Sequence, residues 1–176
     1  SAEKILVVDD EEVIVDLTAL LLRGRGFEVM TAHNGEECLE IVTREQPALV
    51  LLDYMMPVMD GETALKSIVR KFPDTYVIMF TGKGSEEVAV RLMKAGAADY
   101  LQKPFVNSSL LERIDTVLQI REVELANREL MREKDLLQRE IEAWNLHLER
   151  RVEEKSQELE LAHREILQAE KLSALG

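Results

Sequence analysis

Five polar residues in this sequence have types and positions that could carry out a reaction. Each of them lies at or just after the end of a short apolar run: Asp9, Asp10, Asp53, Thr81 and Lys103. Three carboxylates brought together would repel one another and raise one another's pKa unless a cation joined them. A hard divalent cation, Mg²⁺ or Mn²⁺, prefers carboxylate oxygens, while lysine and threonine donate hydrogen bonds to phosphate oxygens. The chemistry that fits the whole set is a phosphoryl group attached to one carboxylate.

The elements that must hold these residues follow from the spacing of the apolar runs. Buried strands are predicted at 5–8, 27–31, 48–52, 76–80 and 99–101, and amphipathic helices at 13–22, 36–44, 62–72 and 86–94. Strands that are apolar on every residue are covered on both faces, as in a parallel sheet with helices on both sides. The pattern therefore predicts a doubly wound α/β fold with a five-stranded parallel sheet. In such folds, ligands bind at the carboxyl ends of the strands, where the five polar residues lie.

Four short motifs surround these predicted strand ends. They are Val7-Val8-Asp9-Asp10-Glu11, Leu52-Asp53-Tyr54-Met55-Met56-Pro57-Val58-Met59-Asp60-Gly61, Phe80-Thr81-Gly82 and Gln102-Lys103-Pro104-Phe105. In their order and spacing they resemble the motifs of two-component receiver domains of the CheY type, over about residues 3–120. The resemblance implies a receiver domain at residues 1–120 with a flavodoxin-like sheet of strand order 2-1-3-4-5. The fifth helix is expected to extend into a long coiled coil.

The resemblance also implies a metal site and a phosphoacceptor. Asp53 would take a phosphoryl group from a histidine kinase or a phosphotransfer protein. Asp10, Asp53 and the backbone carbonyl of Met55 would bind Mg²⁺ or Mn²⁺, and Asp9 would act through a metal-bound water. Apart from this self-phosphorylation and the later dephosphorylation of Asp53, the resemblance implies no enzyme activity for this stretch of chain.

Further residues would contact the phosphoryl group or respond to it. Lys103 would bind the phosphoryl oxygens, and the Lys103–Pro104 peptide bond is expected to be cis, which proline allows. Thr81 would move toward the phosphate, and Tyr100 would turn inward with it. Gly82 departs from the alanine that is commoner in the family, but it keeps the small size needed beside the site.

Plainer interpretations of the same residues stay open at this point. The three aspartates could cap loops and helix starts only, which would leave a receiver fold that takes no phosphate. Thr81 could be a simple hydroxyl at a strand end, and Tyr100 a half-buried aromatic of the sheet.

Charge and composition exclude several other classes of function. The net charge is −12, with 11 basic and 18 acidic residues up to residue 106 and 11 and 16 after it. Because neither part has a basic patch, we expect no binding to nucleic acid. A single cysteine, Cys38, fits a reducing compartment, and no apolar run is long enough to span a membrane, so a cytoplasmic setting is expected.

The remaining chain, residues 108–176, is predicted to be a long helix that forms a coiled coil. Residues 107–175 contain neither glycine nor proline, and an apolar face recurs at alternating steps of three and four, through Ile120, Val123, Asn127, Leu130, Lys134, Leu137, Ile141, Trp144 and Leu148. The step is four twice in succession, from Trp144 to Leu148 and from Leu148 to Val152, which is a stutter that locally unwinds a supercoil. The alternating pattern then resumes from Val152. A parallel homodimer is the expected partner arrangement, because a single helix cannot bury this face alone.

The last nine residues carry a second, shorter resemblance. The segment Gln168-Ala169-Glu170-Lys171-Leu172-Ser173-Ala174-Leu175-Gly176 resembles the approach to the phosphotransfer helix of sensor histidine kinases. Since the chain begins at Ser1 and not at Met, and stops abruptly, we expect it to be a piece of a longer protein. The resemblance implies that this piece is the N-terminal part of a receiver-containing sensor histidine kinase. Two alternatives stay open, namely a response regulator whose coiled coil is itself the output and a parent with another enzyme, such as a cyclase, in place of the kinase.

Overall fold

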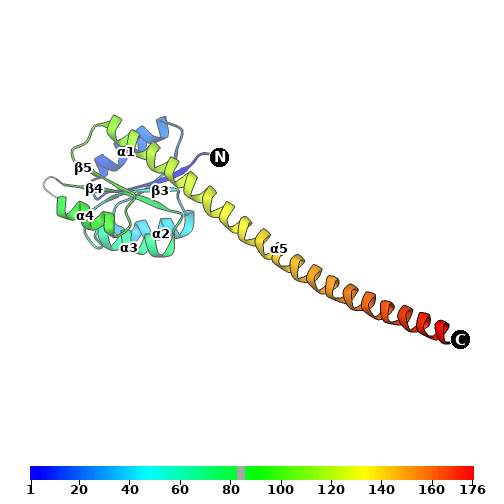
Figure 1. Ribbon diagram of the computed structural model, residues 1–176. Helices are drawn as coiled ribbons and strands as arrows, with labels where there is room; N and C mark the ends of the chain where they lie inside the picture. Colours follow the sequence, from blue (N-terminus) through cyan, green and yellow to red (C-terminus); the bar gives the residue numbers. More distant parts are fainter. Residues whose placement is uncertain (83–85) are drawn as a thin grey trace. The chain divides into compact units, whose positions relative to one another are not determined.

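The computed structural model describes residues 1–82 and 86–176, in which strands and helices alternate along the chain (Figure 1). The elements are β1 (Lys4–Val8), α1 (Glu12–Gly24), β2 (Glu28–Ala32), α2 (Gly35–Glu45), β3 (Leu49–Asp53), α3 (Gly61–Lys71), β4 (Tyr76–Thr81), α4 (Glu86–Lys94), β5 (Asp99–Gln102) and α5 (Asn107–Leu175). The strands form one parallel sheet in the order β2-β1-β3-β4-β5. The predicted fold class and strand order are confirmed.

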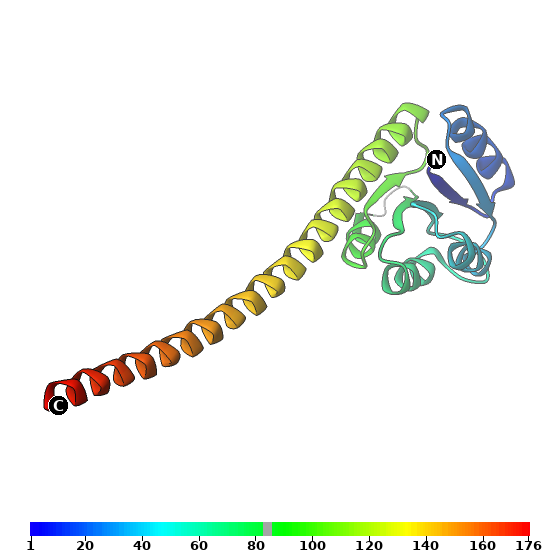
Figure 2. The ribbon, with the colours of Figure 1, turned by 90° about the vertical axis from the view of Figure 1, so that its right-hand side faces the viewer.

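Two hydrophobic cores cover the two faces of this sheet. Figures 1 and 2 show α1 and the first part of α5 on one face, and α2, α3 and α4 on the other. Alternate strand residues point to opposite faces, so Ile5 and Val7 join the core under α1 and α5, while Leu6 and Val8 join the core under α2 and α3. Burial on both faces explains why the strands are apolar on consecutive residues.

Four of the five predicted strands end one residue too early, and for β3 and β4 the added residue belongs to the candidate site. The predicted ends at Leu52 and Phe80 become Asp53 and Thr81, because backbone pairing continues past the last apolar side chain. Asp53 pairs with Phe80, and the amide of Tyr54 donates to the Phe80 carbonyl oxygen at 3.0 Å. A polar side chain can therefore belong to a strand when its backbone groups still have partners in the sheet.

The chain divides into two compact units, Ser1–Leu125 and Ala126–Gly176. The first unit includes the start of α5, whose apolar side is buried at Leu110, Ile114 and Val117. The second unit is the rest of α5, and every residue in it is exposed. Among the described residues, none of the helices is long and apolar enough to cross a membrane.

Polar contacts hold the last turns of α5 within the first unit. Nε of Arg121 donates to the backbone carbonyl oxygen of Asp74 at 2.7 Å, just before β4. The hydroxyl of Tyr76, the first residue of β4, donates to the carboxylate of Glu124. The end of the first unit is therefore attached to the start of strand β4.

Candidate functional site

Three carboxylates meet at the carboxyl edge of the sheet. Asp9 and Asp10 follow β1, and Asp53 ends the neighbouring strand β3. One oxygen of each of these residues lies within 4.8 Å of the others. Asp9 is fully buried and Asp53 is 6% exposed, whereas Asp10 is open to solvent. The three aspartates singled out in the sequence are thus brought together at a partly open acidic site.

Lys103 lies in the same site, in the loop between β5 and α5. Its Nζ is 2.5 Å from Oδ2 of Asp9 and 3.4 Å from Oδ1 of Asp53. Its backbone amide donates to the carbonyl oxygen of Thr81 at 2.7 Å, which ties this loop to the end of β4. The amide of Glu11 donates to the other oxygen of Asp9 at 3.0 Å. Asp9 is therefore held on both oxygens, while Asp53 has the looser contact with Lys103.

Burial and charge shift the pKa of both partners. Burial, reinforced by the charge of Asp9, raises the pKa of Asp53 from 3.8 to about 7, although the charge of Lys103 acts in the opposite direction. Burial alone would lower the pKa of Lys103, but its contacts with Asp9 and Asp53 outweigh this effect and raise it. Without a further cation, the site thus holds a charged lysine beside a carboxyl group that is poised to bind a proton near neutral pH.

The loop after Asp53 is shaped by a close backbone approach and a left-handed residue. A Cβ atom on Gly61 would lie 2.2 Å from the carbonyl oxygen of Asp53, so only glycine fits there. Val58 has a φ of 71°, a region that favours glycine, and the amide of Met59 donates to the carbonyl oxygen of Pro57 at 2.8 Å across it. Met55, in the same loop, has an exposed side chain.

Thr81 and Tyr100 lie on neighbouring strands β4 and β5. Thr81 is buried, whereas Tyr100 is 39% exposed, so its ring is not enclosed in the core. Both residues line a pocket of about 470 Å³, together with Glu86 and Ala89 at the start of α4. The two residues predicted to switch therefore border one space between α4 and β5.

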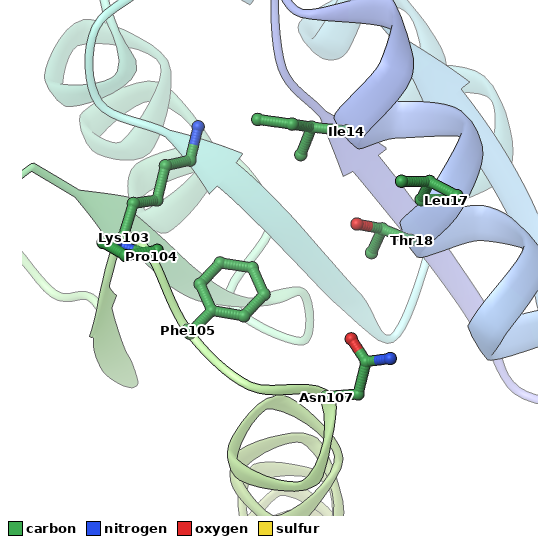
Figure 3. A pocket seen from close by; sticks show the side chains of 7 residues that line it. All are labelled: Ile14, Leu17, Thr18, Lys103, Pro104, Phe105 and Asn107. Carbon is green, nitrogen blue, oxygen red and sulfur yellow. The ribbon is translucent and has the colours of Figure 1, made fainter.

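An apolar pocket of about 570 Å³ lies beside Lys103 (Figure 3). Helix α1 contributes Ile14, Leu17 and Thr18, and the segment from β5 to α5 contributes Lys103, Pro104, Phe105 and Asn107. The Lys103–Pro104 peptide bond is cis, as predicted.

One polar cluster near the site was not predicted. Arg91 of α4 reaches Glu62 of α3 with its Nε at 3.1 Å and donates from Nη2 to the hydroxyl of Tyr54 at 2.7 Å. Tyr54 directly follows Asp53, so this cluster joins α3 and α4 to the loop after β3. No sequence spacing identifies it, because the three residues come from separate parts of the chain.

Comparison with known proteins identifies the family. A family model described as the response regulator receiver domain matches residues 5–115 of the chain. The chain belongs to this family. A CheY-like receiver domain protein from Methanospirillum hungatei JF-1 is 36% identical over 70% of this chain and 99% of its own, with a TM-score of 0.68. A receiver domain protein from Clostridium thermocellum is 35% identical over 69% of this chain and 98% of its own, with a TM-score of 0.66.

A longer relative is also similar. NtrX from Brucella abortus is 33% identical over 74% of this chain, with a TM-score of 0.70, but this receiver chain spans only 30% of the length of NtrX. Receiver domains of two-component systems accept phosphate from histidine kinases or phosphotransfer proteins, and they generally bind Mg²⁺ at an acidic pocket. The cluster of Asp9, Asp10 and Asp53 fits such a pocket.

Proposed function

We propose that Asp53 is the phosphoacceptor of this receiver domain and that its phosphorylation depends on Mg²⁺ or Mn²⁺. The observation that carries the proposal is the meeting of Asp53 with Asp9, Asp10 and Lys103 at the carboxyl edge of the sheet. In the reaction, an oxygen of Asp53 attacks the phosphorus of a phosphohistidine. The P–N bond breaks, and its electron pair returns to the imidazole of the donor.

The donor set suits a hard divalent cation. Asp10, Asp53 and the backbone carbonyl of Met55 would hold it directly, with Asp9 acting through a bound water, since Mg²⁺ prefers oxygen ligands and retains waters. Bound there, the cation supplies positive charge that keeps the carboxylates ionised and offsets the charge of the transferred group. Asp10 is exposed, so the proposed site is open to ions and to a donor protein.

The chain's own residues would position and neutralise the phosphoryl group. Lys103 already lies 3.4 Å from Oδ1 of Asp53, so its ammonium group needs little movement to donate to a phosphoryl oxygen. Thr81 ends the strand next to Asp53 and would donate its hydroxyl to another oxygen. Tyr100 is half-exposed at the shared pocket and would turn inward as Thr81 moves.

We further propose that the second unit carries the signal to an attached module. Its exposed apolar face would form a parallel coiled coil with a second copy of the chain, and the attached module would be a histidine kinase. The resemblance of residues 168–176 to the approach to a phosphotransfer helix supports the kinase. The single free thiol, Cys38, supports a cytoplasmic setting for the proposed system.

A direct test is incubation with Mg²⁺ and acetyl phosphate, followed by intact-protein mass spectrometry. We expect the wild-type chain to gain one phosphoryl group, and the gain to disappear with EDTA or in Asp53→Asn. Asp60→Asn is the matched control, because Asp60 lies in the same loop but caps α3 by accepting from the amide of Thr63 at 2.8 Å. An unphosphorylated wild-type chain, or equal labelling of Asp53→Asn, would refute the proposal.

A further inference from the structure

The second unit is one helix with an exposed apolar face. Its large side chains Leu130, Leu137, Ile141 and Trp144 are 53–65% exposed, and every residue from 126 to 176 is exposed. We infer that this face packs against a second copy of the chain in two alternative ways, and that the phosphorylation state of Asp53 shifts the balance between them. The inference rests on the proposed phosphoacceptor and dimer.

We call the line of contact residues in the first packing the first seam, and it contains the largest apolar residues. It alternates steps of three and four through Asn127, Leu130, Lys134, Leu137, Ile141, Trp144 and Leu148. Continued beyond Leu148, the same alternation would bring Arg151, Glu158 and Glu165 into the interface, where unpaired charges are strongly disfavoured. The first seam must therefore break at the stutter in order to reach Val152.

The line of contact residues in the second packing, called the second seam, follows the heptad pattern without interruption. The downstream alternation runs through Val152, Lys155, Leu159, Ala162, Ile166 and Ala169. Extended backwards with the same steps, it passes through Leu148, Asn145, Ile141, Gln138, Lys134, Met131 and Asn127. A continuous heptad seam can thus run from residue 127 to residue 169 without a stutter.

The two seams share every second residue and differ in the others. Asn127, Lys134, Ile141 and Leu148 belong to both. The others change by one position, from Leu130 to Met131, from Leu137 to Gln138 and from Trp144 to Asn145. In heptad geometry, this change is a rotation of each helix by about 50° about its own axis. The first seam buries more apolar surface, but its supercoil is interrupted by the stutter. The second seam has no stutter, but it buries the side-chain amides of Gln138 and Asn145. Each packing therefore has one stabilising feature that the other lacks.

Charges beside the first seam favour a second copy in parallel orientation. In a parallel, in-register pair, Glu133 faces Gln138 of the second copy and Glu140 faces Asn145 of the second copy, so no like charges meet at these positions beside the seam. Within the seam, Lys134 faces its own counterpart, which costs stability but also fixes the register. An antiparallel pair would place the glutamates at 133 and 140 opposite one another, and this repulsion is destabilising. Asn127 lies in both seams, where an asparagine paired with its own counterpart fixes the register.

The test is disulfide cross-linking of full-length chains that carry one introduced cysteine. Leu137→Cys reports the first seam, Gln138→Cys the second, and Arg139→Cys is an exposed-face control. Cys38 is buried, and the unchanged chain measures its background. We expect Leu137→Cys to cross-link at least 5-fold more than Gln138→Cys, because the first seam buries more apolar surface. The exchange Trp144→Asn with Asn145→Leu should reverse this ratio. If this exchange leaves the ratio of Leu137→Cys to Gln138→Cys cross-linking unchanged, the proposal of two packings is refuted.

Beryllofluoride with Mg²⁺, which mimics a phosphoryl group, tests the link to Asp53. We expect beryllofluoride to raise the cross-linking of Gln138→Cys relative to Leu137→Cys at least 3-fold when Asp53 is present. The same ratio should not change when these chains also carry Asp53→Asn. Bound beryllofluoride seen by fluorine NMR, together with an unchanged ratio, would overturn the link. Absence of bound beryllofluoride would instead refute the phosphoacceptor, and absence of cross-links at residues 137 and 138 alike would refute the dimer. The failures of the separate proposals are therefore distinguishable.

Discussion

Replacing Asp53 with asparagine should change how the stability of the first unit depends on pH. Burial and the charge of Asp9 raise the pKa of Asp53 from 3.8 to about 7. A carboxyl group with a raised pKa keeps its proton in the folded protein at pH values where the unfolded chain has lost it. Without Mg²⁺, the folded protein therefore loses stability as the pH rises between these two values. The Asp53→Asn variant lacks the titrating group and should lack this loss.

The size of the effect follows from the pKa shift. One pKa unit corresponds to about 1.4 kcal/mol, so the full difference in the free energy of unfolding is about 4 kcal/mol. Part of the loss occurs below pH 5, which leaves about 2–3 kcal/mol between pH 5 and pH 8. Mg²⁺ should restore most of this loss at pH 8 in the wild-type chain, because a bound cation favours the ionised carboxylate.

Urea titrations in EDTA at pH 5 and pH 8 measure this effect. Trp144→Phe in every chain removes the only tryptophan, so that emission comes from the three tyrosines, all of which lie within residues 1–125. Comparing wild type with Asp53→Asn at each pH cancels the titration of other groups. Asp60→Asn should keep the wild-type dependence, since Asp60 has a lowered pKa caused mainly by its backbone hydrogen bond from Thr63. An equal difference between wild type and Asp53→Asn at both pH values would refute the argument.

Three further predictions can be checked by the same titrations. Gly61→Ala should lower the free energy of unfolding by about 2–3 kcal/mol, because its Cβ would lie 2.2 Å from the carbonyl oxygen of Asp53. Gly82→Ala should change this free energy by less than about 0.5 kcal/mol, because a Cβ there would have no heavy atom of the described residues within 4 Å apart from its chain neighbours. Equal effects would contradict the close approach. Val58→Gly should raise the free energy of unfolding by about 1 kcal/mol, because glycine adopts a φ of 71° without strain. A lower free energy of unfolding in this variant would show that Val58 is not strained. Lys103→Met should raise the pKa of Asp53 further, so the fall in stability extends to higher pH, and an unchanged pH profile would speak against their electrostatic contact.

The strands of the sheet and the edge at which the site lies could be predicted, because each is marked by the types of neighbouring residues in the sequence. Strands buried on both faces must be apolar on every residue, and the polar residue that follows marks where a strand reaches the edge. This reasoning brought Asp9, Asp10, Asp53 and Lys103 to one place, and the structure has them there. The strand ends were less accurate, because Asp53 remains in the sheet through its backbone pairing with Phe80.

Contacts between distant segments were not predictable in this way. Arg91, Glu62 and Tyr54 meet only because α3, α4 and the loop after β3 pack together, and neither charge nor spacing marks them in advance. The sequence also does not predict that Lys103 lies closer to Asp9, at 2.5 Å, than to Asp53, at 3.4 Å.

Strand β4 has a mechanical consequence. It starts at Tyr76, whose hydroxyl meets Glu124 near the end of the first unit, and it ends at Thr81 beside Asp53. A six-residue strand spans about 20 Å, and its neighbours on both sides make it stiff. A displacement of Thr81 therefore moves the whole strand as one rigid body and shifts Tyr76 at the opposite end of the sheet. In the reverse direction, a rotation of the start of α5 would be transmitted through Tyr76 to Thr81.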